Sequence, residues 1–173
     1  EISWTLSTFA SVSPTSPTRS PTLSPSESNK LEDHACYLDS VNNPETDKDV
    51  SCRREGLTGP IPAALGDLSL LTYLSLMNSN DLTGSIPAAL GKITDLEVLE
   101  LHENYGITGT IPPELGDLTK LAGYLTLKGN KLTGTVPHAL GKLTKLNQLE
   151  LHQNQLTGCV PESINLCASS TSG

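Results

Sequence analysis

The chain has 173 residues, of which 17% are charged, and its formal net charge is −8 at pH 7. The phosphate backbone of a nucleic acid would repel such an acidic chain, so the composition argues against a nucleic-acid partner. No apolar run reaches the roughly 18 residues of a membrane-spanning helix, so the sequence predicts no membrane span.

Residues 1–12, EISWTLSTFASV, hold the one Trp and the one Phe of the chain. Their apolar side chains fall mostly on alternate positions, which is the periodicity of a strand. A free amphipathic strand can add to the edge of a sheet, so we predict an assembly strand that docks on a neighbouring subunit through Ile2, Trp4, Leu6 and Phe9. The alternative is that this stretch is the remnant of a signal peptide or of an upstream module.

Residues 13–29 form a predicted stalk. From 11 to 28, Ser, Thr or Pro occupies 14 of 18 positions. Proline excludes a helix or an inner strand and favours an extended polyproline-II chain. Closely spaced Ser and Thr beside Pro are typical of O-glycosylated stalks, and an unmodified linker is the alternative. The chain has no N-x-S/T sequon, so the predicted O-glycosylation sites are Ser13, Thr15, Ser16, Thr18, Ser20, Thr22 and Ser24.

Four cysteines lie in two local pairs, one near each end of the rest of the chain. Metal-binding spacing is missing, so we predict two disulfides and an oxidising, extracellular location. Cys36–Cys52 would staple an N-terminal cap over residues 30–52. On the loop-entropy model, this disulfide would stabilise the fold by about 3 kcal/mol. Cys159–Cys167 would staple a C-terminal cap and tail over residues 159–173.

Between the caps, residues 53–158 repeat one motif. It reads GLTGPIPAALGDL, DLTGSIPAALGKI, GITGTIPPELGDL, KLTGTVPHALGKL and QLTGCVPESINL. Its first apolar residue recurs at intervals of 25, 25, 25 and 24, at Leu57, Leu82, Ile107, Leu132 and Leu156. A period in the twenties with this leucine pattern predicts a leucine-rich repeat solenoid of about five coils, because one coil cannot bury its leucines alone.

Each coil contains a short alternating triplet that predicts one strand with a buried face. The triplets begin at Val50, Leu74, Leu99, Leu125 and Leu149. The Gly of each LTG marks a bend, and the Pro three residues later ends a second short strand. In the last coil, Asn154 is placed to bond the backbone where the chain turns.

The LTGxIP motif resembles the plant-type leucine-rich repeat of receptor-kinase ectodomains and polygalacturonase-inhibiting proteins, over residues 50–165. A secreted algal or protist homologue fits as well. The resemblance implies an α/β solenoid with a parallel concave sheet, a second short sheet, 3₁₀ or irregular segments on the convex side, and disulfide-stapled caps. The repeated Thr of LTG also suggests an ice-binding array, an alternative that the motif's own preference for Thr makes weak.

Aligned repeats predict columns of side chains on the concave face, about 4.8 Å apart from coil to coil. Their mixture of aromatic and polar groups is typical of protein interfaces. The predicted binding residues are Tyr73, Ser75, Met77, Glu100, His102, Tyr124, Thr126, Lys128, Glu150 and His152.

The same columns argue against catalysis. Glu100 and Glu150 lie two coils apart, near the top of the carboxylate separation of inverting glycosidases, but an open sheet gives no pocket that would raise one pKa. We interpret both as solvated. His102 and His152 are too far apart to share a zinc ion. The sequence therefore predicts a non-enzymatic chain with no cofactor and no metal site.

Two functional hypotheses follow. The first is an extracellular module of the cell surface or wall that binds a protein or glycan through its concave face, with inhibition of a secreted hydrolase as a minor variant. The second is a structural subunit that assembles into a homopolymeric fibre or surface layer through residues 1–12.

Overall fold

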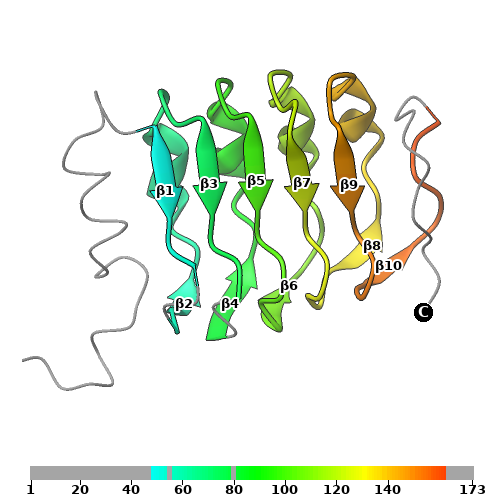
Figure 1. Ribbon diagram of the computed structural model, residues 1–173. Coiled ribbons are helices and arrows are strands. Elements are labelled where there is room, and N and C mark those ends of the chain that lie inside the picture. The colour runs from blue at the N-terminus through cyan, green and yellow to red at the C-terminus, as the bar shows by residue number, and fades with distance from the viewer. Residues whose placement is uncertain (1–47, 54–55, 79–80, 163–173) are drawn as a thin grey trace, which may run out of the picture.

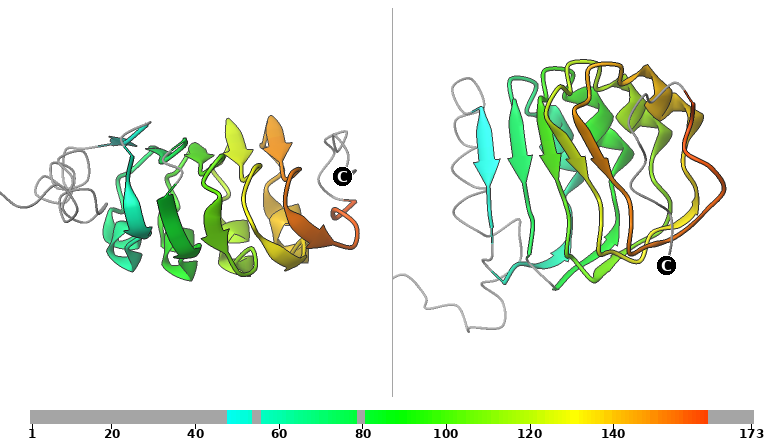
Figure 2. Two further views of the ribbon diagram at one scale, coloured as in Figure 1. Left: turned by 90° about the horizontal axis from the view of Figure 1, so that it is seen from below. Right: turned by 45° about the vertical axis from the view of Figure 1, so that its right-hand side comes forward.

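A computed structural model of the chain describes residues 48–53, 56–78 and 81–162. The described part is a stack of coils, with strands in one layer and short 3₁₀ helices in the layer opposite (Figures 1 and 2). This is the predicted leucine-rich repeat solenoid. No helix among these residues has the length and apolar character needed to cross a membrane.

The larger sheet has five parallel strands in the order β1-β3-β5-β7-β9. The strands are β1 (Asp49–Ser51), β3 (Tyr73–Ser75), β5 (Val98–Glu100), β7 (Tyr124–Thr126) and β9 (Gln148–Glu150). Each starts one residue before the predicted triplet. The backbone ladder still includes the third residue of the triplet. The N–H of Leu76 donates to the backbone carbonyl of Glu100, and that of Leu101 donates to the backbone carbonyl of Thr126.

The opposite layer consists of 3₁₀ helices that follow the Pro of the first four repeats. They are η2 (Ala63–Asp67), η3 (Ala88–Lys92), η4 (Pro113–Asp117) and η5 (His138–Lys142). Each begins after a proline with φ between −63° and −67°, the angle that the pyrrolidine ring imposes. The predicted convex 3₁₀ segments are thus confirmed.

The LTG residues form two shorter parallel sheets, β2-β4-β6 and β8-β10. The strands are β2 (Thr58–Pro60), β4 (Asp81–Ser85), β6 (Gly106–Thr108), β8 (Thr133–Thr135) and β10 (Gln155–Thr157). Their register is staggered: Thr83 pairs with Pro60, and Thr108 with Ser85. The repeated threonines therefore do not form the single aligned column that the sequence suggests.

The interior is one continuous apolar core that runs through every described coil. Leucine and isoleucine side chains from all coils are buried in a single cluster, among them Leu74, Leu99 and Leu125 of the large sheet. Leu149, Leu156 and Val160 of the last coil are only partly buried against it. Because each coil covers the leucines of its neighbour, the stack and not the single repeat is the stable unit.

A ladder of three asparagines, the first two buried and the third partly buried, holds the turns after β5, β7 and β9. The side-chain amide of Asn104 donates to Leu76 O at 2.9 Å and to Leu101 O at 3.0 Å. Asn130 and Asn154 bond equivalent carbonyls, which confirms the role expected of Asn154.

The side-chain oxygens of this ladder differ from coil to coil. The Oδ1 of Asn154 accepts from Leu132 N, whereas the buried Oδ1 of Asn130 accepts no hydrogen bond. Ile107 is the residue equivalent to Leu132 one coil earlier, and its N–H donates to the backbone carbonyl of Asn104, across the extra residue at Tyr105.

Several predictions concern residues outside the described ranges: the assembly strand at 1–12, the stalk at 13–29, most of the cap at 30–52, and the tail beyond 162. Cys52 is fully buried and disulfide-bonded, and its predicted partner Cys36 lies outside the described residues. Cys159 is exposed with a free thiol, which differs from the predicted disulfide with Cys167. Cys167 also lies outside the described residues.

Candidate functional site

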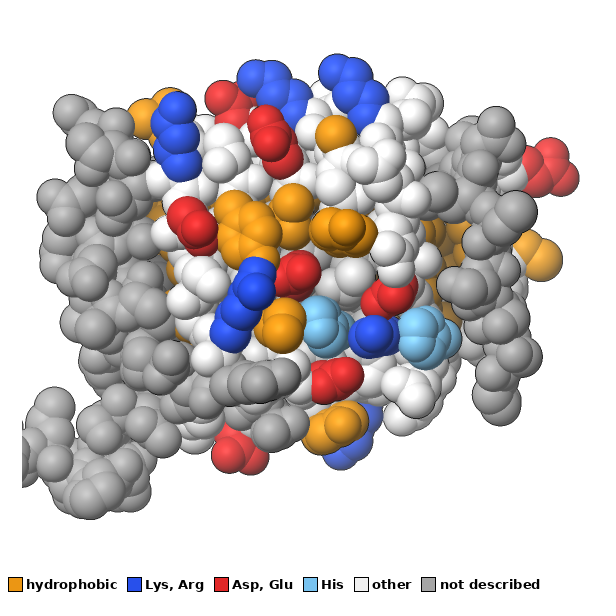
Figure 3. All heavy atoms as spheres, viewed as in Figure 1, with side chains coloured by type: hydrophobic (Ala, Val, Ile, Leu, Met, Phe, Trp, Pro, Cys, Tyr) orange, Lys and Arg blue, Asp and Glu red, His pale blue; other side chains and the backbone are white. Residues whose placement is uncertain are grey.

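The concave face presents three rows of side chains that run across the strands (Figure 3). The tyrosine row is Asp49, Tyr73, Val98, Tyr124 and Gln148; the middle row is Ser51, Ser75, Glu100, Thr126 and Glu150. The basic row, two residues beyond the strands, is Arg53, Met77, His102, Lys128 and His152. The register of the strands confirms the predicted columns: Ser75 pairs with Glu100, and Thr126 with Glu150.

From Ser75 to Glu150 the middle row is a floor that the two outer rows shield, whereas Ser51 at its start is exposed. Ser75 is fully buried and Thr126 is 5% exposed, so these two predicted binding residues do not reach a partner's surface. The side chains of Glu100 and Glu150 are each 16% exposed, which contradicts our interpretation of both as solvated. The long side chains of the outer rows cover them.

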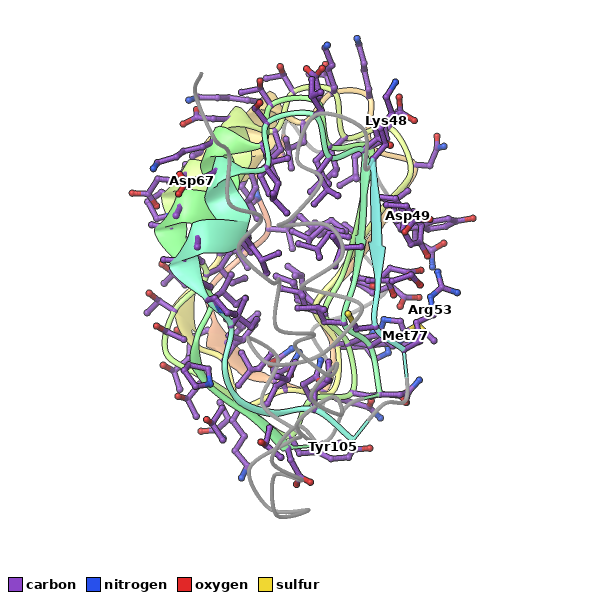
Figure 4. All side chains as sticks on the ribbon, turned by 90° about the vertical axis from the view of Figure 1, so that its left-hand side faces the viewer. Lys48, Asp49, Arg53, Asp67, Met77 and Tyr105 are labelled. Atoms are coloured by element: carbon purple, nitrogen blue, oxygen red, sulfur yellow. The ribbon has the colours of Figure 1, made fainter. Side chains whose placement is uncertain are left out.

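Glu100 is the centre of the first polar cluster. Its Oε2 accepts from Tyr73 OH at 2.8 Å and from Arg53 Nη2 at 3.1 Å. Arg53 also donates through Nε to Ser75 Oγ at 3.1 Å, and its guanidinium lies 5.2 Å from the centroid of the Tyr73 ring. Figure 4, viewed along the stack, shows Arg53 and Met77 projecting from the sheet face opposite Asp67. This cluster joins residues 47 positions apart in the chain.

Glu150 is the centre of the second polar cluster. Its Oε2 lies 3.1 Å from Lys128 Nζ, and its Oε1 accepts from Gln148 Nε2 at 2.6 Å. Burial acts to raise the pKa of Glu150, but the hydrogen bond and charge of Lys128, with smaller contributions from Gln148 and His152, outweigh it and lower the pKa below its ordinary value. The carboxylate is thereby held ionised.

His102 lies between the two clusters. Its Nδ1 is 2.9 Å from Thr126 Oγ1. Burial and the adjacent charge of Lys128 lower the pKa of His102, against the opposing pull of Glu100, Glu103 and Glu150. The ring is therefore biased toward its neutral form, in which one nitrogen donates and the other accepts a hydrogen bond.

The arrangement suits binding better than chemistry. Each glutamate forms an ion pair with its own cation, Glu100 with Arg53 and Glu150 with Lys128. The two carboxylates are therefore not arranged to act together as a catalytic pair across the sheet. Among the residues that the structure describes, no group of three or more His, Cys, Asp or Glu side chains could hold a metal ion. What reaches the surface is the tyrosine row, with Tyr124 45% exposed, and the heads of the basic row.

Five residues of this face lie beyond the set that we predicted. They belong to the same rows as the predicted residues: Asp49, Ser51, Arg53, Val98 and Gln148. Arg53 is the most consequential of the five, because it contacts both the middle row and the tyrosine row. The signal in the sequence that could have identified Arg53 is its place in the same column as Met77, His102 and Lys128.

Comparisons with known proteins support the same fold. The leucine-rich repeat family model matches residues 124–143. A search among curated proteins finds no match. Among solved structures, the chain is 34% identical to the leucine-rich repeat ectodomain of the receptor kinase SOBIR1 from Arabidopsis thaliana, covering 67% of this chain and 62% of that one, with a TM-score of 0.62. For the BIR2 ectodomain, also from Arabidopsis thaliana, the identity is 32%, the coverage 66% and 58%, and the TM-score 0.61.

A third similar structure is the plant peptide hormone receptor RGFR1 in complex with RGF2, at 39% identity and a TM-score of 0.59. The match covers 63% of this chain but 17% of that receptor. The chain thus spans less than two thirds of each of these structures. Over about two thirds of its own length, it has the leucine-rich repeat fold and is similar to the ectodomains of plant receptor kinases.

Proposed function

We propose that the chain is a non-catalytic, extracellular interaction module that binds a protein segment on its concave face. The observation that carries this proposal is the organisation of the three rows: a hydrogen-bonded, shielded floor beneath two rows that reach the surface. One of the similar structures, the plant peptide hormone receptor RGFR1, is a complex with RGF2, which supports a protein ligand over a glycan.

The floor makes the face rigid before any partner arrives. Arg53 and Lys128 are held by Glu100 and Glu150, and Tyr73 is fixed by its own hydrogen bond to Glu100. Ordering rotamer-rich side chains at an interface costs about 0.5–1.5 kcal/mol each, and preorganisation avoids that cost. Exposed Tyr and Arg are also the residue types that most often dominate binding energy.

Photo-crosslinking tests the proposal. A photoreactive phenylalanine derivative replaces Tyr124 on the concave face or, as the matched control, Tyr105, which is 56% exposed at the lower end of the coils, away from the sheet face (Figure 4). Each full-length variant is mixed with cell-surface protein from the source organism. We expect a discrete crosslinked partner from position 124 and none from 105. Equal labelling from both positions, or none from 124, would contradict the proposal.

A second candidate function is self-assembly through residues 1–12. The supporting feature is the edge at β9, which is the last strand of the large sheet among the described residues and lies in the same coil as the partly buried Leu149 and Leu156. An unpaired edge accepts an added strand, and a strand given by the next copy would build an open filament. We expect deletion of residues 1–12 to abolish any concentration-dependent oligomers in size-exclusion chromatography; oligomers that survive the deletion rule the assembly strand out.

A further inference from the structure

The two outer rows differ in chemistry. The tyrosine row is largely apolar between β3 and β7, through Tyr73, Val98 and the exposed Tyr124. The basic row carries two fixed cations, and both are more exposed than the carboxylates that they pair with. The Arg53 and Lys128 side chains are 42% and 27% exposed, against 16% for Glu100 and 16% for Glu150. Each ion pair therefore turns its cation outward and its anion toward the floor.

The outward cations keep donors to spare. Arg53 uses Nε and Nη2 within the first cluster, which leaves Nη1, and Lys128 Nζ carries three N–H groups. A carboxylate placed over the basic row would accept charge-assisted hydrogen bonds from groups that are already oriented. An apolar side chain placed there would instead displace water from these donors and offer no hydrogen-bond acceptor in its place.

We propose that the partner is an extended polypeptide segment that crosses the strands, with apolar side chains toward the tyrosine row and Asp or Glu toward the basic row. This inference rests on the proposed function. Successive side chains of an extended chain point to opposite sides, so one strand lying over the middle row serves both outer rows at once. The four intervals from β1 to β9 span about 19 Å, which about six extended residues cover at ~3.3 Å per residue.

Two acidic side chains set the limits of this surface. Glu103 follows His102 directly and borders the basic row, and Asp49 begins the tyrosine row. Glu103 would repel a carboxylate on the partner. Removing its charge by Glu103→Gln should therefore tighten the binding of an acidic segment, a change in the direction opposite to that expected of any variant that merely damages the fold.

The experiment selects 12-residue random peptides displayed on phage against the immobilised full chain. We expect the selected peptides to alternate apolar and acidic residues. Lys128→Gln and Tyr124→Ser should each weaken a selected peptide by about tenfold or more, as the loss of a central contact does. The matched changes Lys142→Gln, which removes a lysine from the convex ion pair with Asp117, and Tyr105→Ser should leave its affinity within about twofold.

Lys128→Arg keeps the charge and serves as the check on folding, so it should retain most of the affinity. Selected peptides that are neutral or basic, yet still depend on Tyr124, would overturn this inference and leave the proposed function standing. Peptides whose binding ignores both Tyr124 and Lys128 would overturn the proposed function as well. Weaker binding of acidic peptides to the Glu103→Gln variant would also count against the inference.

Discussion

Replacing Gly116 with alanine should lower the free energy of unfolding by about 3 kcal/mol, the upper end of the usual cost of overpacking. Gly116 is buried in η4, and a Cβ built there would lie 2.2 Å from the carbonyl oxygen of Ala139 in η5. The obstacle is backbone, which cannot rotate aside. Gly116 does not have a positive φ, so conformational strain is not the cause. The absence of a side chain is what lets successive coils approach.

Urea denaturation of the full chain measures this effect, with Gly141→Ala as the matched control. Gly141 is the equivalent residue of η5, after which the described residues contain no further 3₁₀ helix, and it is only half-buried. Gly91 should behave like Gly116, because its Cβ would lie 2.4 Å from Glu114 O. If Gly116→Ala costs no more than Gly141→Ala, the packing of coil on coil is not as described.

Replacing Asn104 with alanine should also cost about 3 kcal/mol. The Asn104 side chain is fully buried, and its amide bonds carbonyls of two successive coils, Leu76 O and Leu101 O. Alanine would remove two hydrogen bonds, at about 0.5–1.5 kcal/mol each, and leave a small cavity beside the two carbonyls. The loss acts on the junction between coils and should therefore lower the cooperative transition as a whole.

The control is Asn147→Ala, which removes an exposed amide of the same size just before β9. Chemical denaturation should show a clearly lower midpoint for the Asn104 variant and a midpoint near that of the parent for the Asn147 variant. Equal midpoints for the two variants would mean that the asparagine ladder contributes nothing to the stack.

The repeat period was enough to predict the solenoid and the columns of the concave face, because stacked coils with a fixed spacing of leucines share one core. The parallel sheet was implied by the resemblance to plant-type leucine-rich repeats. The contacts within the face were not predictable in the same way. Alignment places Arg53 in a column, but it does not show that a long side chain can pass over Ser75 to reach Glu100 in the next strand but one.

For the same reason the alignment overstated how much of the face a partner can touch. Ser75 and Thr126 occupy outward positions of their strands, yet both are buried, because Arg53 and His102 hydrogen-bond to their hydroxyls from the neighbouring row. Side-chain length, and not strand periodicity, decides their exposure. The staggered register of the sheet β2-β4-β6 was also not predictable from the alignment, because a period of 25 residues does not determine which backbone groups pair.

A crystal structure of the full chain bound to a peptide selected on its surface would test these claims together. We expect the peptide to lie in extended form across β3, β5 and β7, above the Glu100 and Thr126 floor, with a carboxylate at Lys128 or Arg53 and an apolar side chain against Tyr124. A peptide seated on the 3₁₀ helices or along the edge of β9 would refute the concave face as the binding surface.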